Sequence, residues 1–265
     1  MHDTAGFEAR LQQLIETHAP THLLVSAAYT AVDKAQTEPE LAHAINATAL
    51  GCMGAVARQF HLPVVHFSTD YVFNGQKPLE QRYHPTDPID PRSVYGQTKA
   101  AGEQALLASG AQVVVFRTSW VFSAHGANFV KTMLRLAQER NHLKVVSDQV
   151  GAPTSAEWLA EATLEACAAL RAEHQGVYHL TASGSISWHG FAQRLLAEAR
   201  SLSPERAWTI QSNDQIEAIT TEQFNAPAPR PRNSQLDCST TEADFQIKRP
   251  VWQDQMRAVL KALLP

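Results

Sequence analysis

Residues 64–73 of the chain read VVHFSTDYVF, and this stretch decides the fold. Its first half is short and mostly apolar, which is typical of a strand buried within a parallel sheet. Its second half changes to the small polar residues Ser68, Thr69 and Asp70. Because open α/β sheets bind ligands at the carboxyl ends of their strands, we expect these three side chains to lie in a ligand site.

A second motif, YGQTK at residues 95–99, indicates proton-transfer chemistry. Tyr95 and Lys99 are four residues apart, so on a helix they share one face. An ammonium beside a phenol favours the ionised phenolate, which would let the tyrosine exchange a proton near neutral pH. Taken alone, such a pair is more often exposed helix surface. Its position after the strand that ends in Thr69 and Asp70 favours the catalytic interpretation.

The composition indicates an ordinary globular protein. The chain has 265 residues, of which 44% are hydrophobic and 18% charged, and its formal net charge is −4. It carries no basic block, which argues against a nucleic-acid surface. Cys52, Cys167 and Cys238 have neither the number nor the spacing of a disulfide framework or a zinc site. With no apolar run of roughly 18 residues and no visible export signal, we expect a cytoplasmic protein and no membrane contact.

Amphipathic helical patterns alternate with short β-branched runs, which predicts an α/β fold with a parallel sheet flanked by helices. We expect a Rossmann-type cofactor and catalytic domain over 1–150 and mainly a substrate-binding lobe over 151–265. The strands near 143–146 and 177–180 could extend the sheet of the first domain. The proline-containing run at 227–232 is expected to be a loop folded over the ligand. The expected helices are at 5–18, 38–60, 95–109, 128–140, 155–171, 187–200 and 251–264, and the expected strands at 23–25, 64–67, 113–116, 143–146 and 177–180.

The glycine-rich turn of a dinucleotide-binding fold is absent from this sequence. Its nearest approach, Gly51-x-x-Gly54, lies within a helical pattern, follows no strand and lacks the first glycine of G-x-G-x-x-G. We interpret these two glycines as helix-packing positions. The helix amino terminus that would hold a cofactor pyrophosphate is therefore not expected in this polypeptide.

Seven segments of the sequence carry a family resemblance, at 27–35, 45–48, 68–73, 95–99, 116–121, 148–154 and 230–236. In type and order they resemble those of the dTDP-4-dehydrorhamnose reductases, and the resemblance runs from about residue 5 to the C-terminus. The family belongs to the extended short-chain dehydrogenase/reductases, whose sheet has the strand order 3-2-1-4-5-6-7. Residues 22–27 resemble the fourth strand, so the resemblance implies an N-terminally truncated Rossmann-like fold that starts after the family's Gly-x-x-Gly-Gln-x-Gly turn.

Such a truncation would leave the strand at 22–27 without its neighbour. Leu23, Leu24 and Val25 are apolar enough for burial on both faces of a sheet. An exposed strand edge favours pairing with another chain. We therefore expect self-association through this strand, and weaker cofactor binding than the family shows.

The resemblance implies reduction of the C4 ketone of dTDP-4-dehydro-L-rhamnose by NADPH or NADH. Tyr95 would protonate the alkoxide, Lys99 would lower its pKa and hold the nicotinamide ribose, and Thr69 would donate a hydrogen bond to the substrate carbonyl. The implied cofactor-binding residues are Ala28, Tyr29, Thr30, Phe67, Tyr95 and Lys99, and the implied substrate-binding residues are Thr69, Asp70, Trp120 and Arg230.

Several of these residues have structural interpretations too. Phe67 and Trp120 could belong to the core, and Arg230 could be a solvated loop charge. Glu157 lies where some family members place a metal-binding carboxylate at a subunit contact. A lone helical glutamate is more often solvated surface, so no metal is predicted. The expected partner is a dTDP-sugar substrate, and a homodimer with a second copy of the chain is left open.

Two other functions are compatible with the same fold. One is a non-catalytic regulatory subunit of the methionine adenosyltransferase type, against which the joint presence of Thr69, Tyr95 and Lys99 argues. The other is an inactive fragment of the reductase.

Overall fold

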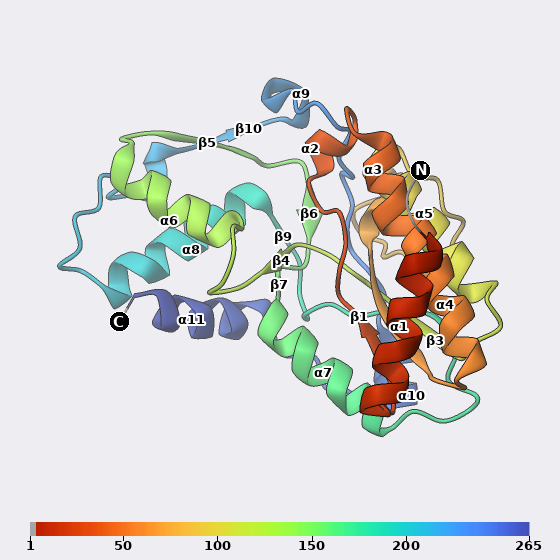
Figure 1. Ribbon diagram of the computed structural model, residues 1–265. Helices are drawn as coiled ribbons and strands as arrows, with labels where there is room; N and C mark the ends of the chain where they lie inside the picture. Colours follow the sequence, from red (N-terminus) through yellow and green to blue (C-terminus); the bar gives the residue numbers. More distant parts are fainter. Residues whose placement is uncertain (1–3, 265) are drawn as a thin grey trace.

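The computed structural model describes residues 4–264, and its centre is a sheet of four parallel strands in the order β1-β2-β3-β8 (Figure 1). These strands are β1 (Leu23–Val25), β2 (Val64–Thr69), β3 (Val113–Thr118) and β8 (Gly176–His179). In the β2–β3 register Val64 lies opposite Val113 and Thr69 opposite Thr118. The polar ends of the two central strands are therefore side by side at one edge of the sheet.

Helices cover both faces of this sheet, as the alternating pattern predicts. Because successive strand residues point to opposite faces, Val64 packs towards α1 (Thr4–His18), α4 (Ala49–Gln59) and α5 (Val94–Leu107), whereas Val65 packs towards α7 (Ala156–Ala168) and α10 (Ser239–Phe245). The first core includes Ile15, Val25, Leu50, Val56, Val64, Leu106, Val113 and Val115; the second includes Val65, Val114, Phe116, Leu159, Ala162, Tyr178 and Phe245. No helix within residues 4–264 combines the length and the apolar character that crossing a membrane requires.

The helix expected over 38–60 is divided. After the short α2 (Val32–Ala35), the chain forms α3 (Pro39–His43), a π-helical turn η1 (Ala44–Thr48) and then α4. Asn46 in the π-helical turn is buried, and its amide donates to the Tyr29 carbonyl and to Thr98 Oγ1 while accepting from the Tyr29 backbone N–H. The extra residue of a π turn is a recurrent feature of functional sites. Here it lets one side chain join the loop after β1 to helix α5.

Gly51 and Gly54 have the packing role expected of them. A Cβ on Gly54 would lie 2.6 Å from the Cβ of Ser109, and one on Gly51 would lie 3.6 Å from the Cβ of Ala105. Both glycines thus face α5 or its C-terminal end, and Gly54 allows a close approach that a larger residue would prevent.

A separate core lies between α6 (Phe129–Glu139), α8 (Trp188–Leu202) and α11 (Trp252–Leu263), on the opposite side of Figure 1 from α1 and α4. The expectation that the strand at 143–146 could extend the main sheet is wrong. This strand, β5 (Leu143–Val146), pairs in parallel with β10 (Ile216–Ile219), because Leu143 and Val145 pack into the core formed with α6 and α8.

The chain crosses between the two parts of the molecule several times. After β5 it returns through α7 and β8 to the main sheet, and then continues into α8. Two short strand pairs lie at the crossings, and three further short helical segments lie in the connecting loops. The pairs are β4 (Val121–Phe122) with β7 (Thr154–Ser155) and β6 (Val150–Gly151) with β9 (Ile186–Ser187); the segments are η2 (Asp70–Val72), η3 (Asn213–Gln215) and α9 (Thr221–Phe224).

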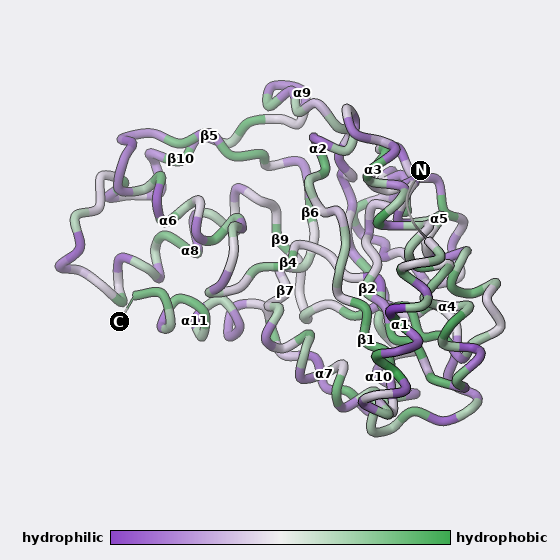
Figure 2. The backbone as a smooth tube through the Cα atoms, viewed as in Figure 1, coloured by the Kyte–Doolittle hydropathy of each residue, from purple (hydrophilic) through white to green (hydrophobic). Residues whose placement is uncertain are grey.

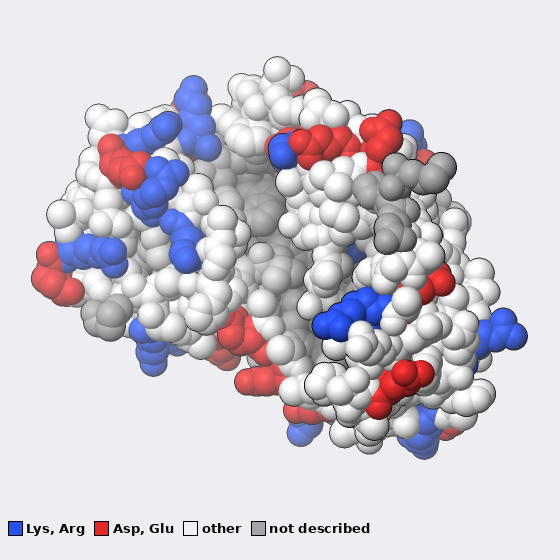
Figure 3. Space-filling model, viewed as in Figure 1, with Lys and Arg blue, Asp and Glu red and all other residues white. Residues whose placement is uncertain are grey.

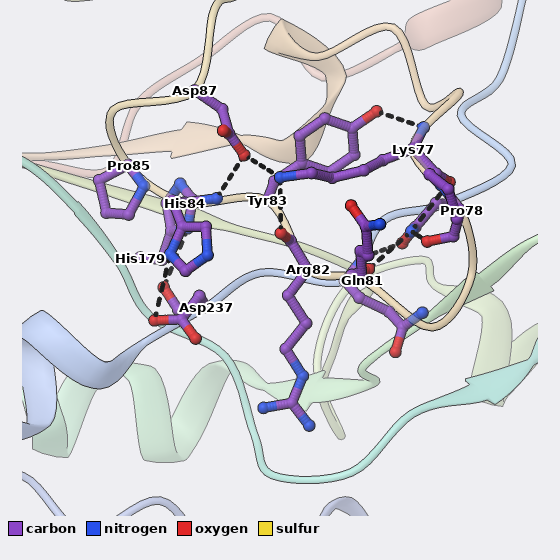
Figure 4. Close-up of polar contacts among 12 residues, drawn as sticks. Lys77, Pro78, Gln81, Arg82, Tyr83, His84, Pro85, Asp87, His179 and Asp237 are labelled. Atoms are coloured by element: carbon purple, nitrogen blue, oxygen red, sulfur yellow. Dashed lines mark hydrogen bonds and ion pairs between the residues drawn. The ribbon is translucent and has the colours of Figure 1, made fainter.

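Hydrogen bonds and an ion pair hold the loop at 74–92 in place (Figure 4). Lys77 donates to the Asp87 carboxylate and to the Arg82 carbonyl. The backbone of Tyr83 pairs with residues 235–237. Asn233 donates to three carbonyls of this loop, those of residues 77, 78 and 81. The loop therefore supports the segment around residue 234, which reaches the ligand site.

Strand β1 is the exposed edge of the main sheet. Among residues 4–264 no other strand pairs with its outer side. Figure 2 shows β1 as a hydrophobic segment, and Val25 is buried, but Leu24 is 44% exposed. The expectation of burial on both faces is therefore wrong at Leu24, because in the described part of the chain no side chains cover the β1 edge on that face.

We predict that the chain self-associates at micromolar concentration and that Leu24→Lys shifts it towards the monomer, because a charge on an edge strand opposes pairing. The free energy of unfolding should change by no more than about 0.5 kcal/mol, since Leu24 is largely exposed. Light scattering measures the association. Leu79→Lys, at a loop residue with 45% exposure, is the matched control and should leave association unchanged. If Leu24→Lys and Leu79→Lys self-associated to the same extent, self-association through the β1 edge would be contradicted.

Candidate active site

A cavity of about 330 Å³ opens at the carboxyl ends of β2 and β3, where the sequence predicts a ligand site. It lies between the two parts of the molecule, where Figure 3 shows a groove. Five of the predicted residues line it: Thr30, Thr69, Asp70, Tyr95 and Trp120. The remaining lining residues include Ser68, Tyr71, Thr118, Ser119, Gln149, Trp188 and Ser234.

Helix α5 brings Tyr95 to this cavity through a close contact at Gly96. Ser93 caps the helix by accepting a hydrogen bond from Gly96 N at 3.1 Å. A Cβ on Gly96 would lie 2.3 Å from the Tyr71 carbonyl oxygen, so only glycine allows the helix to approach η2 this closely. As a result, the Tyr95 ring meets the Tyr71 ring edge-on, with centroids 5.4 Å apart.

Asp70 is a buried carboxylate held by two hydroxyl groups. Thr69 Oγ1 donates to its Oδ1 at 3.1 Å, and Ser234 Oγ donates to its Oδ2 at 2.5 Å. Burial raises the pKa of Asp70 to about 6, although the hydrogen bonds from Ser234 and Thr69 act in the opposite direction. Perturbed carboxylates of this kind are characteristic of functional sites.

The electrostatics of Tyr95 differ from the expectation for YGQTK. Burial raises the pKa of Tyr95, the hydrogen bond with Thr69 lowers it, and the charges of Asp70 and Tyr71 raise it further. Lys99 does not lower it in this structure, because the ammonium points to β2. There Lys99 Nζ donates to the Phe67 carbonyl at 2.7 Å and lies 2.9 Å from His66 Nε2.

Trp120 has a strained backbone and a stacked side chain. Its φ of 52° is in the left-handed region, which is rare for a bulky residue and is found mainly where function requires it. Its indole stacks on that of Trp188, with centroids 3.5 Å apart and planes 7° apart. A Cβ on Gly151 would lie 2.6 Å from the Trp120 ring, so the glycine leaves room for this stack.

Of the predicted cofactor residues, only Thr30 and Tyr95 line the cavity; Ala28, Tyr29, Phe67 and Lys99 lie outside its lining. Ala28 and Tyr29 are half-buried in the loop after β1. The Tyr29 hydroxyl donates to Glu38 at 2.7 Å, and its backbone is held by Asn46. Phe67 packs its ring against the core on the α7 face and contributes its carbonyl to Lys99.

Arg230 lies in a second cavity, of about 390 Å³, which shares Tyr71, Gln149 and Trp188 with the first. Its guanidinium pairs with Asp33 at 2.8 Å and donates to the Tyr71 hydroxyl at 3.0 Å. The rest of the second lining is mainly apolar and aromatic, with one lysine: Phe129, Thr132, Met133, Leu136, Lys144, Val145, Val146 and Phe224. The two cavities adjoin, which suits an elongated ligand.

Three buried hydroxyl groups around the first cavity lack partners within the described residues. They are Ser68 Oγ, Thr118 Oγ1 and Ser119 Oγ, at the ends of β2 and β3. Buried polar atoms are almost always hydrogen-bonded. Their position among the cavity-lining residues fits a polar ligand such as a nicotinamide nucleotide or a sugar.

The sequence reasoning missed Tyr71, Gln149, Trp188 and Ser234 as site residues. Three of these stand inside the segments that carry the family resemblance, so the signal was present for Tyr71, Gln149 and Ser234. Trp188 had no such signal, because a tryptophan at the start of an amphipathic helix is indistinguishable from a core residue. The carboxylate of Glu157 accepts hydrogen bonds from Ser123 Oγ and from the Ala124 backbone N–H.

Comparison with known proteins agrees with this geometry. The family model described as the RmlD substrate binding domain matches residues 5–264. The dTDP-4-dehydrorhamnose reductase of Shigella flexneri is 42% identical over 92% of this chain and 80% of its own length. That of Escherichia coli K12 is 41% identical over 95% of this chain and 82% of its own. The dTDP-4-dehydrorhamnose reductase from Bacillus anthracis, solved in complex with NADP, superposes with a TM-score of 0.86 at 30% identity, covering 96% of this chain and 85% of that one.

We predict that Asp70→Asn stabilises the protein in a pH-dependent manner. Because the pKa of Asp70 in the folded protein, about 6, exceeds the ordinary aspartate value of 3.8, the stabilising contribution of the neutral acid is complete below about pH 4 and is lost as pH rises through 6. The variant avoids this loss, so at pH 8 its unfolding free energy should exceed the parent's by about 1 to 3 kcal/mol, with little difference at pH 4. Urea unfolding at both pH values measures this. Asp90→Asn, at a half-exposed carboxylate, is the control, and the same pH dependence there would contradict the assignment.

Proposed function

The chain belongs to the family described as the RmlD substrate binding domain, and we propose that it reduces the C4 ketone of dTDP-4-dehydro-L-rhamnose to dTDP-L-rhamnose with NADPH or NADH. The observation that carries this proposal is the meeting of Thr69, Asp70 and Tyr95 in one cavity, with Lys99 one helical turn after Tyr95 and its ammonium bound to the Phe67 carbonyl of β2. The relatives named above are reductases, which favours an enzyme over a regulatory subunit.

The proposed chemistry assigns a proton to Tyr95. When bound, the reduced nicotinamide supplies a hydride to C4 of the sugar, and the electron pair of the C=O bond moves to oxygen. Tyr95 gives its phenolic proton to that oxygen, and Thr69 donates a hydrogen bond to it. The raised pKa of Tyr95 keeps the phenol protonated until the alkoxide forms. A proton from solvent then restores the phenol.

Lys99 is proposed to hold the cofactor ribose. An ammonium has three N–H donors, and within the described residues two are directed to the Phe67 carbonyl and to His66. The third is available for a ribose hydroxyl. Thr30 lies at the same cavity, and Ala28, Tyr29 and Phe67 are proposed to border the cofactor from the β1 and β2 side.

The second cavity is proposed to take the nucleotide part of the substrate. Arg230 and Lys144 supply positive charge for a diphosphate, and an arginine fork matches phosphate oxygens. Phe129, Trp188 and Phe224 offer apolar faces to a base. The sugar would then reach Trp120 and Thr69 in the first cavity.

In this arrangement the part built on the main sheet binds cofactor and the part built on α6 and α8 binds most of the substrate. Because α6 precedes residue 150 whereas α7 and β8 follow it, these two parts do not correspond to a single division of the chain at residue 150. Figure 3 shows several Lys and Arg side chains on the α6–α8 side, as suits an anionic nucleotide. We further propose a cytoplasmic enzyme without nucleic-acid or membrane partners, able to act as a homodimer.

Tyr95→Phe should lower kcat by about 10²–10⁴-fold while NADPH binding is retained, because only the acidic hydroxyl is removed. Turnover is followed by NADPH absorbance with dTDP-4-dehydrorhamnose, and binding by nicotinamide fluorescence. Tyr178→Phe removes a phenol that hydrogen-bonds Asp244 away from the cavity and serves as the control. If Tyr95→Phe retained the parental rate, the proton donor would have to be another group.

Arg230→Met should raise KM for the dTDP-sugar by about 10–100-fold, as expected for the loss of a hydrogen bond to a charged group, and should leave cofactor affinity unchanged. Asp33→Asn, which frees the guanidinium from its ion pair, should leave that KM equal or lower. Arg257→Met, at an arginine whose side chain is 52% exposed and pairs with Glu198, is the surface control. An unchanged KM in Arg230→Met would exclude Arg230 from the diphosphate site.

A further inference from the structure

His66 is a buried imidazole that connects three elements of the site. It lies on β2, is 1% exposed, and occupies the same face of the sheet as Val64, towards α5. Its Nε2 is 2.9 Å from Lys99 Nζ, and its Nδ1 is 3.1 Å from the carbonyl oxygen of Val25 on β1. The imidazole thus bridges the edge strand and the catalytic helix.

The partners of the ring determine its tautomer. A carbonyl oxygen can only accept, so Nδ1 must carry the hydrogen. In the neutral ring Nε2 then has a free lone pair, which faces the ammonium of Lys99 as an acceptor. Burial lowers the pKa of His66 to about 3, and the Lys99 charge acts in the same direction, so the ring is neutral at physiological pH.

We propose that His66 is a positioning residue that holds the Lys99 ammonium in place against β2 by accepting a hydrogen bond at Nε2. Because its Nδ1–H is committed to Val25, the acceptor is correctly presented only while β1 is paired with β2. The consequence for catalysis rests on the proposed function, whereas the contact itself is independent of it.

The surroundings of Lys99 make this acceptor important. Lys99 is 2% exposed, and burial lowers its pKa to about 8, opposed by the charge of Glu103. Glu103, one turn further along α5, is itself paired with Arg117 of β3 at 3.0 and 2.7 Å. Apart from Tyr95, which precedes it on α5, the groups that face the ammonium are therefore an already paired carboxylate, the Phe67 carbonyl and His66.

Two substitutions separate the two contacts of the ring. The side-chain oxygen of glutamine reaches about as far as Nε2, so His66→Gln retains an acceptor for Lys99. The shorter asparagine reaches only the Nδ1 position, so His66→Asn retains the donor to Val25 and loses the acceptor. The pair thus forms a matched comparison at one buried site.

The test follows the ionisation of Lys99 by NMR in the full chain labelled with ¹³C in lysine, with Lys99→Met identifying the resonance. His66→Asn should lower the pH at which Lys99 titrates by about 1 to 2 units, the size of a hydrogen bond to a charged group, and His66→Gln should restore it. Identical titration of Lys99 in the parent and in both variants would overturn the proposal.

If His66→Asn does not fold, the contact can be tested by ¹⁵N NMR of the native His66 imidazole. The ¹⁵N resonance of Nε2 should move in Lys99→Met while that of Nδ1 stays in place, and an Nε2 resonance unaffected by Lys99→Met would overturn the contact.

In the reductase assay, His66→Asn should lower kcat and move the high-pH limb of the pH profile downwards, with KM for the sugar unchanged and His66→Gln restoring both. A shifted Lys99 titration with unchanged kcat would overturn the positioning role. Absence of reduction in the parent chain would contradict the proposed function alone, because the NMR comparison still decides on the contact.

Discussion

Helix α5 approaches its neighbours at two glycines, and the position of Tyr95 and Lys99 depends on that approach. A Cβ on Gly96 would meet the Tyr71 carbonyl at 2.3 Å, and one on Gly102 would meet the Asn46 carbonyl at 1.9 Å. A main-chain carbonyl cannot rotate away from an added Cβ as a flexible side chain can, so only glycine is tolerated at these two positions. The two contacts fix α5 against η2 and against the π-helical turn, and so they set Tyr95 at the cavity and Lys99 against β2.

Several charged groups around helix α5 are buried in the protein interior, where apolar side chains would be more stable. Asp70, Lys99 and the Glu103–Arg117 pair are all buried, and removing a charge from water costs several kcal/mol unless partners compensate. Hydroxyls, carbonyls and the neutral His66 supply those partners. Natural proteins often accept lower stability at functional sites, and the expected gain in Asp70→Asn has that origin.

The strands and most helices were predictable because their local patterns agree with their burial. The run from Val64 to Thr69 is a buried strand that ends in polar residues, and the sheet places it accordingly. The division of the helix at 38–60 was not predictable from the local sequence. The π-helical turn depends on hydrogen bonds of Asn46 with Tyr29 and Thr98, which are distant in sequence. The pairing of β5 with β10 joins segments about 70 residues apart in sequence, beyond the reach of any local pattern.

The sequence predicts the meeting of Thr69, Asp70 and Tyr95 at one edge of the sheet, but not the geometry of their surroundings. Spacing correctly places Tyr95 and Lys99 on one helix, but spacing cannot show that the ammonium points to His66 and the Phe67 carbonyl. The stack of Trp120 on Trp188 likewise depends on tertiary contact, because the two residues belong to different elements and meet only across the space left by Gly151.

The most direct test of the account is isotope transfer. The purified chain is given dTDP-4-dehydrorhamnose and saturating NADPH that carries deuterium at the transferable position of nicotinamide C4, and the sugar product is analysed by NMR. The account predicts dTDP-L-rhamnose with deuterium at C4 of the sugar and nowhere else. Deuterium at another carbon, or an unreduced ketone at saturating cofactor, would contradict it.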